Sequence, residues 1–379
     1  MHVKTFCYRD NSGWSVDRFP SGDSERTLVI LFGASKFMDS PAPIHEVTAA
    51  YPNSHLVGCS TAGEIVGSEV TDNCLIVSLV KFERTSLRTA HAPIGSSEDS
   101  FSAGRSIAER LNQPGLRAVF VLSDGLQVNG SELVRGINAV IPDSVVVTGG
   151  LAGDGDRFQR TWIIKDGTSQ CGYVTAVGMY GESIRVGHGS KGGWDMFGPE
   201  RCVTRSKGNV LYELDGKPAL QLYKEYLGER AAGLPATGLL FPLALRSNSL
   251  DQKSLVRTIL AVDEATQSMT FAGDIPQGFL AQLMRANLDR LIDGASHAAL
   301  MTKNGCRETT PALAIAISCV GRRLVLGERA EEEIEAAFDG LPGGIHQIGF
   351  YSYGEISPYA TGSCDLHNQT MTLTTISEL

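Results

Sequence analysis

The sequence predicts a two-domain protein of mixed class: an N-terminal α/β domain with a mixed sheet and flanking helices, then a C-terminal α+β domain. Three observations support this fold class. The chain has 379 residues, which is long for one hydrophobic core. Its first part alternates short apolar runs with helical patterns, as layered α/β domains do. Its later part joins short β runs by turns, which favours antiparallel pairing.

The predicted elements of the first part alternate between strand and helix. Short runs of aliphatic and β-branched residues predict strands at residues 27–32, 55–58, 73–82, 86–93, 117–122 and 145–147. Apolar residues at helical spacing predict helices at residues 41–51 and 101–111, and a third that begins at Ser131. This alternation favours parallel strands at the centre of the sheet.

The rhythm changes after Gln159, where β runs at residues 161–164, 172–179 and 183–187 predict antiparallel strands. Residues 187–208 are rich in glycine and charge, and we interpret them as a structured connection. We therefore place the domain boundary there, with one domain at residues 1–208 and the other at residues 209–379.

The second domain is expected to open with a strand at residues 210–214 and a helix at 218–227, which has proline in its first turn. Further patterns predict strands at residues 254–262, 312–318, 346–353 and 370–376 and helices at 279–293 and 330–338. Strands mixed with helices in this way give the α+β assignment.

Composition excludes several classes of function. The net charge is −9 and lysine and arginine are scattered, so nucleic acid is not expected as a partner. The first residues, Met1 to Tyr8, lack the apolar core of a signal peptide. No apolar run approaches the roughly 20 residues that span a bilayer. We therefore expect a cytoplasmic protein without a membrane partner, and a homodimer is one assembly that the sequence allows.

The eight cysteines are widely spread and form no Cys-x-x-Cys pair, which disfavours a zinc finger. Only Cys59 has a context that suggests reactivity, because it ends a predicted strand beside Gly58 and resembles a nucleophile elbow in outline. The motif has one residue too many, no helix pattern follows it directly, and no histidine can be assigned as its base. We expect no catalytic residue and no enzyme.

A glycine-rich segment, Gly149 to Asp156, follows the strand at residues 145–147. Such segments can cradle phosphate, but this spacing fits neither Gly-x-Gly-x-x-Gly nor a P-loop. Two aspartates would repel phosphate, so a tight turn with an acidic rim is the favoured interpretation. Asp154 and Asp156 could hold a hard cation, although the other ligands of an EF-hand are missing.

His188 is the histidine with the most unusual context, because glycines on both sides leave room for a large flat ligand. One imidazole, apolar walls and cationic edges for propionates are what a haem requires. The residues that would supply the walls and edges are Trp194, Met196, Phe197, Lys191, Arg201 and Arg205. The competing interpretation is a glycine-rich turn with an exposed histidine. His346 and His367 are alternative iron ligands or ordinary core residues.

Longer motifs carry a family resemblance. Gly58 to Ile65, Asp124 to Gly130, Gly349 to Pro358 and Leu366 to Thr372 resemble segments of the FIST family of ligand-sensing proteins, as does Asn209 to Leu220. Residues 1–208 resemble its N-terminal domain and residues 209–379 its C-terminal domain. Within the family, the chain is similar to bacterial nitric oxide sensors, partly through Gly187 to Arg201.

The resemblance implies a b-type haem, nitric oxide as the signal, and a partner histidine kinase or cyclic-di-GMP enzyme. His188 as the iron ligand is our own inference from its neighbours. On this hypothesis nitric oxide weakens the bond between iron and His188, and the freed segment lets the two domains shift. The alternative is a FIST-type sensor of a small metabolite, such as an amino acid, without haem. In that case Glu64, Glu355 and Asp154 would face a polar cleft.

Overall fold

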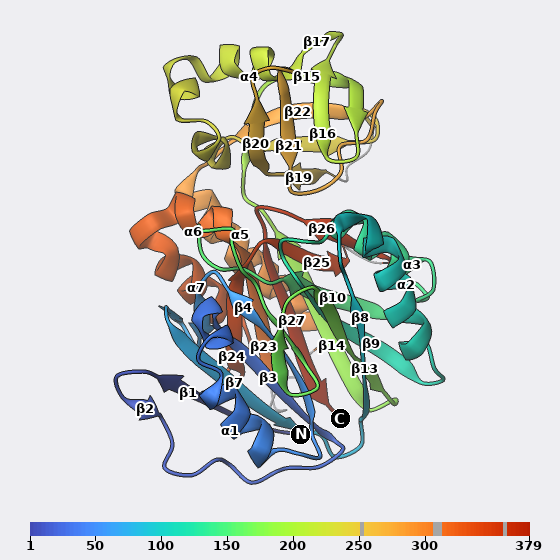
Figure 1. Ribbon diagram of the computed structural model, residues 1–379, viewed down its shortest axis with the longest axis vertical. Coiled ribbons are helices and arrows are strands. Elements are labelled where there is room, and N and C mark those ends of the chain that lie inside the picture. Colours follow the sequence, from blue (N-terminus) through green and yellow to red (C-terminus); the bar gives the residue numbers. More distant parts are fainter. Residues whose placement is uncertain (251–253, 306–312, 359–361) are drawn as a thin grey trace.

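The computed structural model describes residues 1–250, 254–305, 313–358 and 362–379. It shows a large body of packed sheets and helices with a smaller lobe set on one end (Figure 1). Both chain ends lie at the end of the body that is farthest from the lobe. The predicted mixed class of fold is therefore confirmed.

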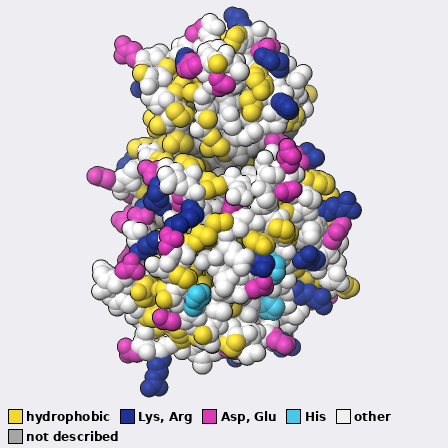
Figure 2. All heavy atoms as spheres, in the orientation of Figure 1, with side chains coloured by type: hydrophobic (Ala, Val, Ile, Leu, Met, Phe, Trp, Pro, Cys, Tyr) yellow, Lys and Arg dark blue, Asp and Glu magenta, His cyan; other side chains and the backbone are white. Residues whose placement is uncertain are grey.

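The lobe comprises residues 195–287, and the body comprises the chain before and after it. Figure 2 shows a narrow waist between the two, with hydrophobic side chains gathered along it on this face. Trp194 stands at the junction, in an apolar cluster with Ala244 and Met284 of the lobe and Leu291 and Leu326 of the body.

Sheet A holds the first parallel pair of the body. Its central strands β3 and β4 are parallel, and β7 and β1 continue the sheet antiparallel on one side. In order across the sheet, the strands are β12 (Thr168–Gln170), β11 (Ile163–Lys165), β4 (His55–Thr61), β3 (Thr27–Ala34), β7 (Cys74–Lys81), β1 (His2–Arg9) and β2 (Gly13–Trp14).

Sheets B and C each contain one further parallel pair, β23 with β24 and β9 with β10. Sheet C runs β26 (Cys364–His367), β25 (Gly354–Pro358), β10 (Val146–Leu151), β9 (Leu116–Ser123), β13 (Tyr173–Tyr180), β8 (Ser86–Pro93). Sheet B runs β14 (Ile184–Lys191), β27 (Met371–Glu378), β23 (Leu313–Cys319), β24 (His346–Ser352), β5 (Glu64–Val66), β6 (Glu69–Thr71).

Helices cover the outer faces of these sheets, and one apolar core fills the space between the inner faces. Phe32 of sheet A meets Phe350 of sheet B there, with ring centroids 4.7 Å apart, and Phe120 of sheet C belongs to the same cluster. The helices are α1 (Ala42–Ala50) on sheet A, α2 (Ser100–Leu111) and α3 (Gly130–Asn138) on sheet C, and α5 (Leu288–Met301) and α7 (Ala330–Asp339) on sheet B, with α6 (Val320–Leu326) directly after β23.

The described part of the lobe is an antiparallel sheet with the α-helix α4 (Ala219–Leu227) packed on it. Two short 3-10 helices follow α4, at Gly228–Gly233 and Ala236–Leu240. Its strands, in order, are β19 (Leu255–Arg257), β18 (Leu243–Arg246), β22 (Leu280–Arg285), β15 (Asp195–Lys207), β16 (Val210–Leu214), β21 (Ser268–Phe271) and β20 (Ile259–Asp263), and β17 (Lys217–Pro218) pairs with β16. Cluster residues such as Val203, Leu220 and Phe271 form a separate core for the lobe.

Strands from the two halves of the sequence share sheets in the body. β14 pairs with β27, β5 with β24, and β10 with β25. The boundary predicted between residues 208 and 209 falls inside the lobe, between β15 and β16. The division into domains at residues 1–208 and 209–379 stays a prediction. In the described structure, residues 195–287 form the lobe, apart from the rest of the chain.

Two local predictions were wrong. Residues 187–208 contain the end of β14 and all of β15, so the supposed connection is largely strand. The helix predicted at residues 279–293 is strand β22 followed by α5, which Asn287 caps by accepting the N–H of Arg290. β14 pairs with β27, and β22 pairs with β15 and β18. These partners are distant in sequence, so local periodicity could not reveal the pairing. The strand expected from residue 312 begins at Leu313, and Ala312 lies outside the described residues.

The glycines beside His188 have a packing role. A Cβ atom on Gly187 would lie 2.2 Å from the carbonyl oxygen of Thr302, and one on Gly189 would lie 2.1 Å from that of Ala298. Helix α5 and the turn after it therefore already occupy the space that these glycines leave. They permit close contact between a strand and a helix, as glycine often does.

This packing can be tested with Gly189→Ala. We expect the free energy of unfolding to fall by about 1–3 kcal/mol, because the added methyl group forces α5 away from β14. Gly343→Ala is the matched control, since a Cβ there meets nothing within 4 Å. Urea unfolding of both variants measures the effect, and equal stabilities would contradict the close contact.

Candidate functional site

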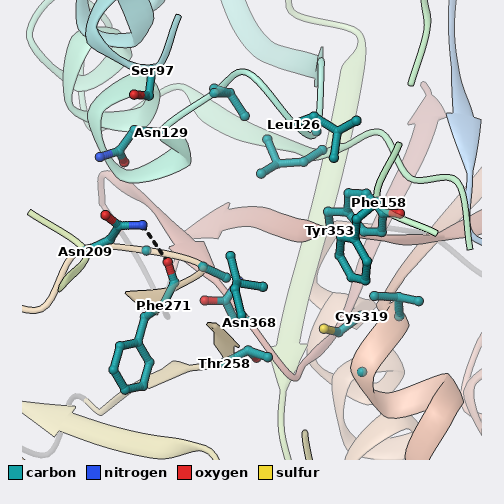
Figure 3. A pocket seen from close by; sticks show the side chains of 18 of the residues that line it. Ser97, Leu126, Asn129, Phe158, Asn209, Thr258, Phe271, Cys319, Tyr353 and Asn368 are labelled. Carbon is teal, nitrogen blue, oxygen red and sulfur yellow. Dashed lines mark hydrogen bonds between the residues drawn. The ribbon is translucent and has the colours of Figure 1, made fainter. Parts of the chain in front are cut away.

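A cavity of about 340 Å³ lies at the junction of body and lobe. This is within the usual size range of small-molecule sites. Figure 3 shows side chains from both parts around it. The body contributes Leu126, Asn129, Phe158, Cys319, Tyr353 and Asn368 among others, and the lobe contributes Asn209, Leu239, Thr258, Leu260 and Phe271.

The cavity lies beyond the carboxyl ends of parallel strands. Gly125 and Leu126 follow β9, Leu151 ends β10, Cys319 ends β23, and Tyr353 follows β24. Ligand sites of α/β sheets commonly lie at this edge, because the loops after parallel strands converge there.

Two aromatic rings form a flat apolar wall. Phe158 stacks on Tyr353 with ring centroids 4.4 Å apart and an interplanar angle of 15°. The Tyr353 hydroxyl donates to the carbonyl oxygen of Gly155, 2.9 Å away, and also contacts the Asp154 carboxylate. Asp154 in turn accepts the backbone N–H groups of Gln159 and Arg160. The segment from Gly149 to Asp156 therefore fixes this wall, and its buried aspartate is fully engaged in doing so.

The loop after β9 forms another wall. The Asp124 carboxylate accepts the backbone N–H groups of Leu126 and Gln127, both at 2.8 Å. A Cβ on Gly125 would lie 1.9 Å from the carbonyl oxygen of Ala152, so only glycine fits this approach. The motif Asp124 to Gly130 thus shapes the cavity through its backbone.

Asn368 is the unusual polar group of the site. The residue is 1% exposed, and neither Oδ1 nor Nδ2 has a hydrogen-bond partner among the described residues. The Thr258 hydroxyl, which also lines the cavity, is likewise buried and unpartnered within the described chain. Each such group costs about 1–3 kcal/mol of stability, so three unpartnered atoms at one cavity are unexpected for packing alone.

The turn that carries Asn368 joins β26 to β27 and is firmly held. Gln369 has a φ of 60°, which turns the chain in the left-handed region. Its carbonyl oxygen accepts from Trp194 Nε1 at 2.8 Å and from Arg322 Nη1 at 3.3 Å. The Thr370 hydroxyl and backbone N–H both donate to the Glu355 carboxylate, at 2.9 and 3.2 Å.

Arg322 and Glu333 form a fully buried ion pair beneath this turn, with 2.6 Å between Nε and Oε1. Arg322 Nη2 donates to the carbonyl oxygen of Leu291 at 2.8 Å, and Nη1 also contacts that of Gly192. Glu333 accepts from the hydroxyl of Tyr351 at 3.1 Å. The pair therefore links α5, α6, α7 and the junction with the lobe.

The cavity wall is neutral. None of its described lining residues is aspartate, glutamate, lysine, arginine or histidine. Burial raises the pKa of Cys319 to about 12, so its thiol is uncharged near neutral pH. Burial likewise raises the pKa of Tyr353.

Arg257 is the buried charge behind one wall, where a Cβ on Gly273 would lie 2.9 Å from its Nε. Its Nε donates to the carbonyl oxygen of Asp274, and its Nη1 to those of Val256 and Leu366, each at 3.1 Å. Burial lowers the pKa of Arg257 to about 10, which still leaves it charged at neutral pH.

The residues predicted to hold haem do not line this cavity. His188 lies on β14 opposite Thr374 of β27. Its Nδ1 is buried without a partner among the described residues, and burial lowers its pKa. An unpartnered ring nitrogen would suit a metal ligand. The space beside the flanking glycines, however, is occupied by α5 and the turn after it.

The other predicted haem contacts are dispersed. Trp194 lies in the junction cluster, whereas Phe197 packs with the lobe core and Met196 is 49% exposed. The basic residues point elsewhere: Lys191 is exposed, Arg201 pairs with Asp215, and Arg205 pairs with Glu213. The contacts of these residues therefore do not gather them in one described pocket. The described residues also contain no group of three or more His, Cys, Asp or Glu placed to hold a metal ion.

The alternative histidines also lie outside the cavity. His367 is 4% exposed, and its Nε2 lies 2.9 Å from the carbonyl oxygen of Ser357, so that nitrogen is engaged. His346 is exposed at the start of β24. Haem binding, at these or other positions, stays a prediction.

Cys59 and the acidic residues that were considered as site residues do not line the junction cavity either. Cys59 is fully buried in sheet A, and burial raises its pKa well above the usual value, which makes it a poor nucleophile. Asp154 is buried while Asp156 is exposed, so the two do not form one cation site. Glu64 accepts from the backbone N–H of Cys74, and Glu355 from Thr370. Neither lines the junction cavity, although Glu64 lines a separate cleft together with Asp72 and Arg323.

Sequence reasoning missed Asn368 and Thr258 as site residues. Asn368 stood within a quoted motif, Leu366 to Thr372, without a role. A signal was present, because an Asn-Gln pair between two short strands predicts a turn. Thr258 carries no comparable signal, since its position depends on how the lobe meets the body.

In the described part of the chain, no helix is both long and apolar enough to cross a bilayer.

Comparison with known proteins places this architecture in a family. The chain is 28% identical over 196 residues to a protein of Methanocaldococcus jannaschii named "Uncharacterized protein MJ1623". The similarity covers 47% of this chain but only 36% of that protein. A family model of the FIST N domain matches residues 27–217, and one of the FIST C domain matches residues 219–358. FIST domains are sensor domains of signal transduction, and this chain belongs to the FIST family.

Proposed function

We propose that this chain is a sensor that binds a small molecule in the junction cavity and reports its presence through the position of the lobe. The observation that carries the proposal is the buried, unpartnered amide of Asn368 at the cavity wall. A folded protein retains such a group at a cost, and a ligand that satisfies it recovers that cost as binding energy.

The cavity is suited to transmission because a ligand in it contacts both parts of the molecule. Asn368 belongs to the body, and Thr258 belongs to the lobe. Contacts across the junction are both apolar and polar. They include the cluster around Trp194, the hydrogen bond from Asn129 Nδ2 to Asp274 at 3.0 Å, and the hydrogen bond from Arg257 to Leu366. A ligand that bonds to both sides would favour one arrangement of lobe and body, which is how a ligand shifts a conformational population.

Detection of nitric oxide by a haem on His188 remains the finer function that the family resemblance implies. The dispersed positions of the seven predicted contact residues do not favour it. The metabolite alternative is favoured by the cavity, although the neutral wall supports an amino acid poorly as the ligand. We retain a histidine kinase or a cyclic-di-GMP enzyme as the proposed receiver of the signal.

Glu355 keeps the ligand-binding turn in place, and burial favours its protonated form. It is fully buried and accepts from Thr370, and the Ser352 hydroxyl lies 2.7 Å from its other oxygen. Burial raises the pKa of Glu355 to about 8. A site held rigid before the ligand arrives loses less entropy on binding.

The proposed function can be tested by blocking the cavity. Wild-type protein should gain thermal stability from at least one member of a metabolite library that includes haemin. A compound at 100 times its Kd contributes about 2.7 kcal/mol. Leu260→Trp should abolish the gain by filling the cavity, since Leu260 lines it and is 44% exposed. Leu250→Trp, at a residue that is 90% exposed, is the control. The absence of any stabilising compound, or gains that survive Leu260→Trp, would contradict the proposal.

Asn368→Leu should stabilise the unliganded protein by about 1–3 kcal/mol, because it removes a buried polar group that has no partner. The adjoining cavity gives the larger side chain room. Asn209→Leu at the same cavity should instead destabilise by about 1 kcal/mol, because Asn209 Nδ2 donates to the carbonyl oxygen of Phe271 at 2.8 Å. Urea unfolding measures both variants, and a loss of stability in both would show that Asn368 is satisfied.

Glu355 should make stability depend on pH. Its pKa is about 8 in the folded protein against a reference value of 4.5, so between these values only the folded state holds the proton. The contribution of this group therefore falls as pH rises from 5 to 8. Glu355→Gln mimics the protonated acid, so the stability of wild type relative to this variant should fall over that range. We expect at least about 1.4 kcal/mol, the equivalent of one pKa unit.

Urea unfolding at pH 5, 6.5 and 8 checks this, with Glu335→Gln at an exposed position on α7 as the control. Parallel pH curves for wild type and Glu355→Gln would show that Glu355 is ionised in the folded protein.

A further inference from the structure

The chemistry of the cavity restricts what can occupy it. Resting on the proposed function, we infer that the ligand is an uncharged molecule with a carboxamide or lactam edge on a flat apolar body. Asn368 would bind the edge, and the stacked rings of Phe158 and Tyr353 would contact the body.

Charge is the first restriction. The described lining residues include no aspartate, glutamate, lysine, arginine or histidine. Many of the lining residues are apolar, such as Leu126, Leu151 and Leu260. An ion that enters such a space loses hydration without gaining a counter-charge, at a cost of several kcal/mol. An uncharged ligand avoids this cost.

The amide of Asn368 supplies the second restriction. Its oxygen accepts and its nitrogen donates, and both lie on the edge of one planar group. The complementary ligand edge therefore carries a donor and an acceptor side by side, as a primary amide or a lactam does. This conclusion holds for either orientation of the Asn368 amide, because exchanging Oδ1 and Nδ2 leaves one donor beside one acceptor.

Thr258 adds a polar contact from the opposite part of the molecule. Its buried hydroxyl has no partner among the described residues and can either donate or accept. A ligand edge satisfied by Asn368 still has free lone pairs or hydrogens, which the hydroxyl can meet. The same small polar group would then bridge body and lobe.

The aromatic wall accounts for the flat apolar body. Phe158 is 44% exposed although it is large and apolar, and it stacks on a Tyr353 ring that is almost buried. Flat rings pack well against such a pair in offset or edge-on arrangements. A volume of about 340 Å³ accommodates one ring system with a short polar group.

An anionic ligand held by Arg257 is the strongest rival. Its guanidinium, however, already donates to three backbone carbonyl oxygens, and Arg257 is not among the residues that line the cavity. These contacts hold Arg257 in a structural role at the junction.

Four compounds of nearly equal shape test the inference: benzamide, acetophenone, benzoate and benzamidinium. Dissociation constants are measured by ligand-observed NMR at pH 7.5 on the full chain. We expect benzamide to bind at least about ten-fold tighter than either ion, equivalent to about 1.4 kcal/mol. Acetophenone has the carbonyl acceptor but no donor, so its dissociation constant should lie between that of benzamide and those of the two ions. Asn368→Leu should weaken benzamide to the level of acetophenone and leave acetophenone nearly unchanged. Thr258→Val replaces a hydroxyl by a methyl group, and it tests the contact from the lobe in the same way: benzamide should bind more weakly to this variant.

The other outcomes each overturn a defined part. Tightest binding by benzoate would assign the site to an anion and to Arg257, and tightest binding by benzamidinium would assign it to a cation. Equal binding of benzamide and acetophenone would remove the role of the Asn368 amide. Another outcome is that none of the four compounds binds, while Leu260→Trp still abolishes stabilisation by a library compound. In that case the inferred ligand class is wrong and the proposed function stands. If binding is insensitive to Leu260→Trp, the proposed function itself fails.

Discussion

The arrangement around the cavity depends on one buried ion pair, Arg322 with Glu333, whose side chains are both fully inaccessible. Breaking such a pair by removing one partner typically costs about 3–5 kcal/mol, because the remaining charge is left without compensation. Here the guanidinium also donates hydrogen bonds to the carbonyl oxygens of Gly192, Leu291 and Gln369. These three belong to the entry into the lobe, to α5 and to the turn that carries Asn368. One charged group therefore fixes the body, the junction and the binding turn relative to one another.

The family motifs acquire physical meaning in this arrangement. Glu355 lies in the motif Gly349 to Pro358 and bonds to Thr370 in the motif Leu366 to Thr372. The motif Asp124 to Gly130 shapes a second wall, and Asn209 contributes a third from the lobe. Segments that are far apart in the sequence thus meet at one cavity. None of them supplies a charged or nucleophilic side chain to its lining within the described chain, which is consistent with a binding site.

Local sequence patterns predicted most of the body correctly. The strands at Thr27–Ala34 and Cys74–Lys81 and the helix at Ser100–Leu111 follow from their own apolar periodicity. Elements stabilised by distant partners were missed or misread. Only the start of β14 was predicted, at residues 183–187, and the strand continues to Lys191 because β27 pairs along its whole length and α5 packs against it. β22 has helical spacing of apolar residues but lies between β15 and β18.

The same distinction explains the site. The choice of His188 as the iron ligand rested on glycines that leave space in a sequence, whereas in the fold that space is occupied by α5 and the turn after it. Composition around a single residue cannot show whether a gap is filled by a ligand or by another part of the chain. Asn368 shows the opposite case. An asparagine in a turn attracts no notice in a sequence, and only the fold shows that its amide is buried without a partner among the described residues. A polar group that the fold buries and leaves without a partner opposes stability, so its presence beside a cavity argues for a role in binding.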